Sequence, residues 1–199
     1  PIERGATGNP ARNLLEGLNY IRTNSLFAFL IGMTFFNSFF GMAYVSLMPV
    51  IAKDALGQGA GAYGILLSAS GVGSLLVTVL FGFADNPQYK RLLIIGGAVL
   101  FGLTLVAFGL TSELIGSYGL ALALLFVMGV FTSSYMVSIQ STLQMMVPDG
   151  MRGRVMGFYG MTWSIMPLGA MPASGLAVLI GAPFAIAAGG IAVAAFALG

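Results

Sequence analysis

Residues 92–110 read LLIIGGAVLFGLTLVAFGL, a run that contains no charged residue. A helix of this length crosses the hydrocarbon core of a bilayer, which is roughly 30 Å thick, while satisfying its own backbone hydrogen bonds. A strand of an outer-membrane barrel would be shorter and would alternate apolar with polar residues. The stretch therefore predicts a transmembrane helix.

Five further runs of low charge flank this one, and the connections between them are short. Only 7% of the residues are charged, against about a quarter in a typical soluble domain, so lipid has to be the solvent. We predict an all-α polytopic membrane protein whose transmembrane domain covers residues 26–199. Its six antiparallel spans are approximately residues 26–52, 62–84, 92–110, 118–146, 155–180 and 182–198.

The charges of the loops separate by side. Lys53 lies on one side, beside Asp54 and Glu113. The other seven basic residues lie on the opposite side: Arg4, Arg12, Arg22, Lys90, Arg91, Arg152 and Arg154. The positive-inside rule makes that second side cytoplasmic and predicts an inner-membrane protein with both termini in the cytoplasm. Basic residues scattered among loops do not predict a nucleic-acid partner.

Residues 1–25 contain no apolar segment of the kind that forms the core of a signal peptide. We therefore expect the sequence to be a fragment that begins within a loop of a longer chain. Apolar residues recur there at helical spacing, which predicts an amphipathic helix on the cytoplasmic surface of the bilayer. The alternative is a soluble linker helix. The apolar positions are Leu14, Leu15, Leu18, Ile21 and Leu26.

The chain contains neither cysteine nor histidine. This excludes Cys- or His-dependent catalysis and most zinc sites, so we expect no enzyme, no cofactor and no metal centre. No acidic residue lies in the middle of a predicted span, although proton relays in transporters need an intramembrane carboxylate. Proton coupling would therefore require a carboxylate from elsewhere.

Two predicted spans have polar faces, which we interpret as the lining of a substrate cavity. In the first span the polar sector contains Thr34, Asn37, Ser38 and Gly41, whereas in the fourth span one face contains Ser133, Gln140 and Gln144. Hydrogen bonding between helices is the alternative for Asn37, and close helix packing is the alternative for the serines. Pro167 and Pro172 should bend the fifth span.

The loop at residues 147–157 reads VPDGMRGRVMG and joins two long helices. Asp149 is a plausible N-cap of the second helix. Arg152 and Arg154 then occupy its first turn, where cations oppose the helix dipole, so each arginine needs an acidic partner. One such partner is Asp149.

This loop resembles the corresponding loop of the major facilitator superfamily, and most closely of its drug-efflux permeases and enterobactin-type siderophore exporters. Residues 15–22 (LEGLNYIR), residues 47–52 (LMPVIA) and the glycine-rich opening of the second span are similar as well. The resemblance implies that the six spans are the second half of a twelve-helix fold. It also implies a missing N-terminal six-helix half as partner, with a cavity lined by the first and fourth spans and alternating access by rocking of the two halves.

The resemblance further implies a cytoplasmic gate, in which basic residues that open the eleventh helix approach an acidic loop of the first half. Here Gly82 and Asp85 are three residues apart instead of the family's four, and the family's inner Arg-x-Gly is absent. The candidate gate residues are Asp85, Lys90, Arg91, Asp149, Arg152 and Arg154.

These features predict a permease that exports amphiphilic small molecules, such as drugs or siderophores, as a proton-coupled antiporter. One alternative is a six-span half-transporter that works as a homodimer or heterodimer. Another alternative is a membrane scaffold that does not transport.

Overall fold

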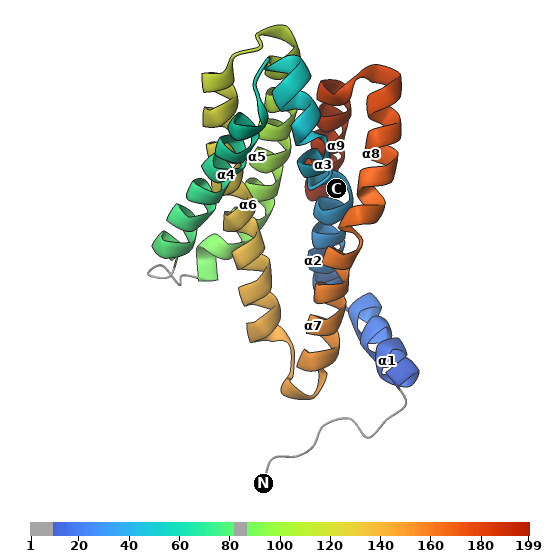
Figure 1. Ribbon diagram of the computed structural model, residues 1–199. Coiled ribbons are helices and arrows are strands. Elements are labelled where there is room, and N and C mark those ends of the chain that lie inside the picture. Colours follow the sequence, from blue (N-terminus) through green and yellow to red (C-terminus); the bar gives the residue numbers. More distant parts are fainter. Residues whose placement is uncertain (1–9, 82–86) are drawn as a thin grey trace.

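The computed structural model describes residues 10–81 and 87–199, without the side chains of residues 10–14, 60, 81 and 87–89. All elements within these ranges are helices (Figure 1). Arg4 and Asp85 fall outside the described residues, as do the side chains of Arg12 and Leu14. The elements are α1 (Pro10–Thr23), α2 (Ser25–Phe36), the π-helix η1 (Asn37–Gly41), α3 (Tyr44–Val50), the π-helix η2 (Ile51–Ala55), α4 (Ala60–Phe81), α5 (Pro87–Leu114), α6 (Tyr118–Met146), α7 (Asp149–Ser164), α8 (Met166–Ile180) and α9 (Ala182–Leu198).

Five helical segments are long and apolar enough to cross a bilayer, and α9 is a sixth apolar helix of 17 residues. The all-helical class is thereby confirmed. The predicted limits of the third span are too narrow, because α5 begins at Pro87 and ends at Leu114. Lys90 and Arg91 therefore lie in the first turns of a helix and not in a loop. A helix can extend past the apolar run into the headgroup region, and proline at the first position favours such a start.

Two of the spans are interrupted. The first span passes from α2 through η1, α3 and η2, and it begins where the Asn24 side chain accepts hydrogen bonds from the backbone N–H groups of Leu26 (3.1 Å) and Phe27 (3.4 Å). The fifth span is divided at Ile165 into α7 and α8, with Pro167 in the first turn of α8. The bend predicted from Pro167 is confirmed, while Pro172 lies inside α8.

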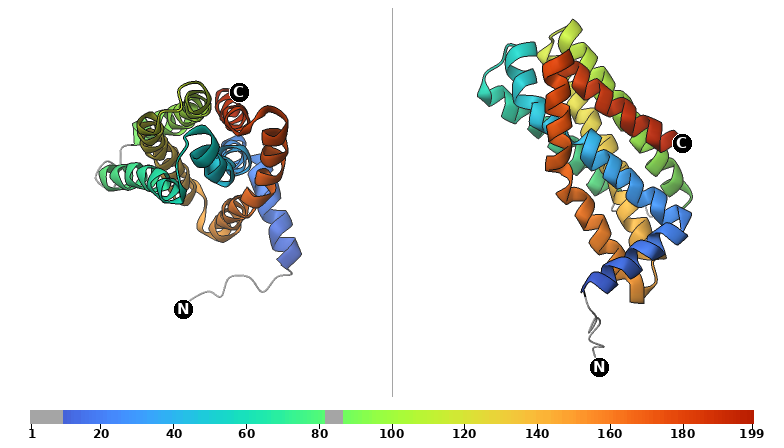
Figure 2. Two further views of the ribbon diagram at one scale, coloured as in Figure 1. Left: turned by 45° about the horizontal axis from the view of Figure 1, so that its top comes forward. Right: turned by 90° about the vertical axis from the view of Figure 1, so that its right-hand side faces the viewer.

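The helices form a bundle in which α5 lies between α6 and α9, and α4 runs beside α6. Glycines permit the α4–α6 contact, since a Cβ atom on Gly129 would lie 2.0 Å from the carbonyl oxygen of Ser70. The Ser74 hydroxyl donates to the carbonyl oxygen of Gly129 over 3.2 Å. The left view of Figure 2, taken obliquely toward the top of the bundle, shows the first span, in blue and cyan, among the other helices.

The ends of the bundle differ in charge. The start of α5, the α6–α7 turn and α1 lie at the lower end in Figure 1, while η2 and the α5–α6 turn lie at the upper end. The basic residues in the described ranges therefore gather at the lower end, with Lys53 as the exception. Helix α1 packs on α7 where Gly17 meets Arg154 and Phe158, and Ile21 is buried.

Candidate functional site

The polar sector of the first span lies inside the bundle. Thr34, Asn37 and Ser38 have no exposed surface, and Gly41 is buried beside them. The Thr34 hydroxyl donates to the carbonyl oxygen of Leu30 over 3.0 Å, so its hydrogen-bonding capacity is used within its own helix. Helical periodicity grouped these residues correctly, but the sector faces neighbouring helices of the same bundle.

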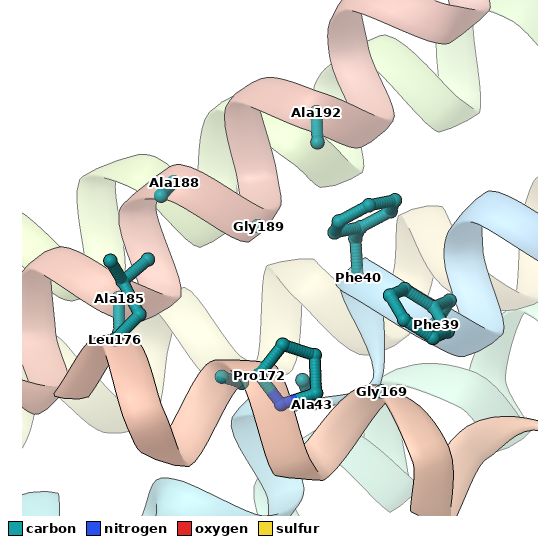
Figure 3. A pocket seen from close by; sticks show the side chains of 11 residues that line it. Phe39, Phe40, Ala43, Gly169, Pro172, Leu176, Ala185, Ala188, Gly189 and Ala192 are labelled. Carbon is teal, nitrogen blue, oxygen red and sulfur yellow. The ribbon is translucent and has the colours of Figure 1, made fainter.

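The backbone widens into a π-helix where this sector lies. The Met42 N–H donates to the carbonyl oxygen of Asn37 over 2.7 Å, a bond across five residues. A Cβ atom on Gly169 or Gly189 would meet the carbonyl oxygen of Phe39 (2.0 Å) or Phe40 (2.6 Å), so both glycines leave room for the widened turn (Figure 3). Such π-turns within α-helices are frequent at functional sites. The sequence analysis did not predict this one.

Four buried polar atoms near the π-turn have no hydrogen-bond partner among the described residues: Asn37 Oδ1, Asn37 Nδ2, Ser38 Oγ and the Tyr135 hydroxyl. Asn37 Oδ1 and the Phe101 ring both lie against Gly41, and the Phe101 ring packs on Tyr135 with centroids 5.9 Å apart. Buried polar groups are normally hydrogen-bonded, so each of these atoms is a candidate contact for water or a small polar solute. An amide offers two donors and an acceptor but no acid–base chemistry.

Tyr135 was not among the predicted site residues. It belongs to α6 and is fully buried. Its position in a run of small polar residues, Thr132, Ser133 and Ser134, was the available signal. That signal did not identify the Phe101 ring of α5 as its neighbour.

The polar face of α6 has a different environment. Gln140 and Gln144 are exposed and Ser133 is half-buried. Gln140 lies about three turns beyond Gly129 on the same face of the helix, given about 100° per residue. Helix α4 contacts that face at Gly129, yet Gln140 is uncovered. The glutamines therefore lie on the face of α6 that contacts α4, but beyond the part of this face that α4 covers.

The remaining faces of α6 serve packing. The hydroxyls of Ser134 and Ser138 each donate to a carbonyl oxygen one turn earlier, over 2.7 Å in both cases. These two serines are buried, as are the apolar side chains of Met136, Ile139 and Leu143. The apolar strip of α6 thus points into the core.

Ion pairs form at the basic end of the bundle. Arg152 pairs with Asp149 at 2.8 Å, and Arg154 pairs with Glu16 of α1 at 2.7 Å. Both arginines thus have acidic partners within this chain, and Glu16 was not predicted. The interpretation of Asp149 as an N-cap is wrong, because extended Pro148 occupies the cap position and Asp149 is the first residue of α7.

The other predicted gate residues lie at the start of α5. The Lys90 ammonium donates to Ser141 Oγ and to Met145 Sδ of α6, both over 3.1 Å. Arg91 is exposed, and Asp85 lies outside the described residues. Within the described ranges no group of three acidic, histidine or cysteine residues could hold a metal ion.

An apolar cavity of about 140 Å³ lies beside the π-turn, among η1, α8 and α9 (Figure 3). Phe39 and Phe40 border it on one side, and Pro172 and Leu176 border it on another. None of the predicted cavity residues lines this space. The buried polar sector and this apolar cavity are therefore on different sides of the first span.

A family model described as Major Facilitator Superfamily matches residues 30–199. The matched range includes the π-turn, the polar face of α6 and the two arginines of α7. No curated protein and no solved structure matches the chain. The chain therefore belongs to the Major Facilitator Superfamily, whose members are membrane-embedded secondary transporters and not enzymes.

Proposed function

We propose that this chain is the C-terminal half of a proton-coupled exporter of amphiphilic small molecules. In this proposal an N-terminal six-helix half completes the cavity, and the two halves rock to give alternating access. The resemblance of residues 147–157 to drug-efflux and siderophore-exporting permeases supports the substrate class. The polar face of α6 supports the location of the substrate path.

The observation that carries the proposal is the exposure of Gln140 and Gln144 on a membrane-spanning helix. Both side chains lie close to the end of α6 at Met146, beside Ser141 and Met145, which the Lys90 ammonium contacts. A pair of exposed glutamines on one face at this level suits the cytoplasmic end of a solvated path. We assign direct substrate contact to Gln140, Gln144 and Ser133.

The first span has a supporting role in this proposal. The side chains of Asn37 and Ser38 are buried without a hydrogen-bond partner among the described residues, which suits bound water better than direct contact with a bulky substrate. Thr34 and Gly41 lie beside them at the π-turn. We assign these four residues to an inner polar wall that water reaches when the halves move.

Proton coupling requires carboxylates from outside the described spans. Asp54, Glu113 and Asp149 lie at or near helix ends, Glu16 lies in α1 before the first span, and no described acidic residue lies in the middle of a span. Titratable groups for coupling are expected inside a membrane protein, facing its cavity. This supports an N-terminal half that supplies the proton-binding carboxylate.

For the gate we propose that Arg154 changes partners during the transport cycle. Its pair with Glu16 belongs to the state described, and the acidic loop of the other half replaces Glu16 when the cytoplasmic side closes. Arg152 remains with Asp149 on its own helix. Lys90 and Arg91 form the second basic group at this end. Asp85 stays a candidate gate residue from the sequence alone, since it lies outside the described residues.

Transport is tested by dye efflux from energised cells that lack their own exporters and express the full reading frame. Replacing Gln140 and Gln144 by alanine should slow energy-dependent efflux of an amphiphilic cationic dye about tenfold, the effect of about 1.4 kcal/mol. The control is Gln58→Ala, since Gln58 is an exposed glutamine in the η2–α4 loop. No efflux above that of the empty vector would favour the scaffold, and equal efflux in all variants would contradict the assigned path.

Orientation is tested separately, because the chain contains no cysteine. Single cysteines at Glu113 and at Arg152 occupy opposite ends of the bundle. A membrane-impermeant maleimide added to intact cells should label the cysteine at 113 and spare the one at 152. The reverse pattern would place both chain termini outside the cytoplasm.

A further inference from the structure

A second cavity, of about 300 Å³, opens between α2, α5 and α6 at the basic end of the bundle. It is separate from the cavity beside the π-turn, and it shares no residue with the polar face of α6. Six apolar side chains make most of its wall: Leu26, Phe29, Leu30, Ile94, Ile95 and Met146.

The remaining lining residues are two cations and a threonine. The Thr142 hydroxyl donates to the carbonyl oxygen of Ser138 over 2.7 Å, so it needs no partner from the cavity. The interior of the cavity therefore offers an apolar surface. Among the lining residues, only Lys90 and Arg91 offer favourable contacts to a charged ligand group.

The charged residues of the lining are both basic. The Lys90 ammonium is held against α6 by Ser141 and Met145, which are the neighbours in the chain of the lining residues Thr142 and Met146. Arg91 is exposed, and among the described carboxylates none lies within ion-pair distance of it. Both cations are in the first turns of α5, where the helix dipole also favours an anion. A guanidinium group matches a phosphate with two parallel hydrogen bonds.

The cavity also lies at the depth of a lipid headgroup. Lys90 and Arg91 directly precede the uncharged run at residues 92–110, so the cations lie at the edge of the hydrocarbon and the cavity extends into it. Two basic lining residues and an otherwise apolar wall fit a molecule with an anionic head and an apolar tail. Basic pockets between transmembrane helices on the cytoplasmic side bind anionic lipid headgroups in other membrane proteins.

We propose that this cavity is a binding site for an anionic phospholipid. The phosphate contacts Arg91 and Lys90, and one acyl chain enters the space between α2, α5 and α6. The proposal is independent of transport activity, although the cytoplasmic leaflet as the source of the lipid rests on the orientation proposed above. Occupancy of this site would link the first span to α5 and α6 through a lipid tail.

The test is lipid retention by the purified full-length protein. The protein is reconstituted with equal amounts of phosphatidylglycerol and phosphatidylcholine, and the lipids that remain bound after mild detergent exchange are counted by native mass spectrometry. We expect the wild-type protein to retain phosphatidylglycerol preferentially. Arg91→Ala should weaken this retention about fivefold, the effect of about one basic residue near a lipid surface.

Two further variants distinguish the contribution of the headgroup contacts from that of the acyl chain and from that of basic residues elsewhere at this end of the bundle. Met146→Trp, at an exposed position of the wall, should obstruct the cavity and lower retention with both cations intact. Arg152→Ala removes a basic residue at the same end that does not line the cavity, and it should retain the wild-type amount. All variants are first compared with the wild type by elution profile and helical content.

Three results would overturn the proposal. Equal retention of the two lipids would show that the charge of the headgroup does not contribute to binding. Unchanged retention in Arg91→Ala and Met146→Trp would show that the lipid binds outside this cavity. A loss in Arg152→Ala as large as in Arg91→Ala would indicate a diffuse basic surface. Inorganic phosphate should not displace the lipid, because displacement would mean that the acyl chain contributes nothing to binding.

Discussion

The polar sector of the first span and the polar face of α6 look alike in the sequence, but their surroundings differ. The side chains of Asn37 and Ser38 are completely buried and have no hydrogen-bond partner in the part of the chain that the structure describes, whereas Gln140 and Gln144 are exposed. The first span lies among the other helices in Figure 2, and its polar sector is on a buried side. Polar residues within spans can thus belong to two classes, one inside the bundle and one on an open face.

The contact between α4 and α6 determines which face of α6 is open, and changing it should have the largest effect. In Gly129→Leu the new Cβ atom would approach the carbonyl oxygen of Ser70 to 2.0 Å, so the two helices have to separate. We expect the free energy of unfolding to fall by about 3 kcal/mol. The measurement is thermal unfolding together with the yield of monodisperse protein.

The control for this prediction is Gly119→Leu on the same helix. Nothing lies within 4 Å of a Cβ atom at Gly119, so this variant should unfold like the wild type. Equal stability of both variants would mean that α6 does not dock on α4 at Gly129. There would then be no structural reason to regard the polar face of α6 as more open than the polar sector of the first span.

Chemical accessibility tests the comparison directly. In the cysteine-free chain, a cysteine at Gln140 should react with a small maleimide on the order of a hundredfold faster than one at Ser38, because the buried site requires local opening that costs a few kcal/mol. Labelling rates in reconstituted protein give the ratio. A cysteine at exposed Ser117 provides the reference rate. Similar rates at the two sites would show that the inner sector is open to solvent.

Most substitutions of buried residues destabilise a protein, but replacing Asn37 by an apolar residue should stabilise this one, because its amide has no hydrogen-bond partner among the described residues. Leucine has a similar shape and no polar atoms, so Asn37→Leu should raise the free energy of unfolding by about 1–3 kcal/mol while reducing transport. Gln140→Leu should change stability little, because Gln140 is exposed. Thermal unfolding and dye efflux are measured on the same preparations. A loss of stability in Asn37→Leu would mean that water or a solute already satisfies the amide.

Periodicity and charge predicted much of this architecture. The apolar runs located the helical spans, and the spacing of Thr34, Asn37 and Gly41 placed these residues in one sector. Periodicity identifies residues that share a face, but it does not identify what covers that face. For this reason the sequence could not distinguish the buried sector of the first span from the open face of α6.

The features missed by the sequence analysis depend on contacts between distant segments. The π-turn at Asn37–Gly41 requires space that Gly169 and Gly189 provide from two later helices. Tyr135 becomes a candidate site residue only beside Phe101. The pairing of Arg154 with Glu16 joins α7 to α1, which are far apart in the chain. Local propensity contains no information about such contacts.

The two ion pairs of α7 give the smallest expected effects and test whether charges at the bundle end behave differently from both polar faces. In the Glu16–Arg154 pair both side chains are partly exposed, at 40% and 30%, so Glu16→Gln should lower the free energy of unfolding by only about 0.2–1 kcal/mol. Asp149→Asn, in a pair whose carboxylate is 90% exposed, should have less effect still.

Thermal unfolding at low and high salt is the measurement, and salt should abolish the difference between Glu16→Gln and the wild type because it screens surface charges. A larger loss that persists in high salt would show that α1 is held to α7 by a desolvated ion pair, and Arg154 could then not exchange partners at low cost.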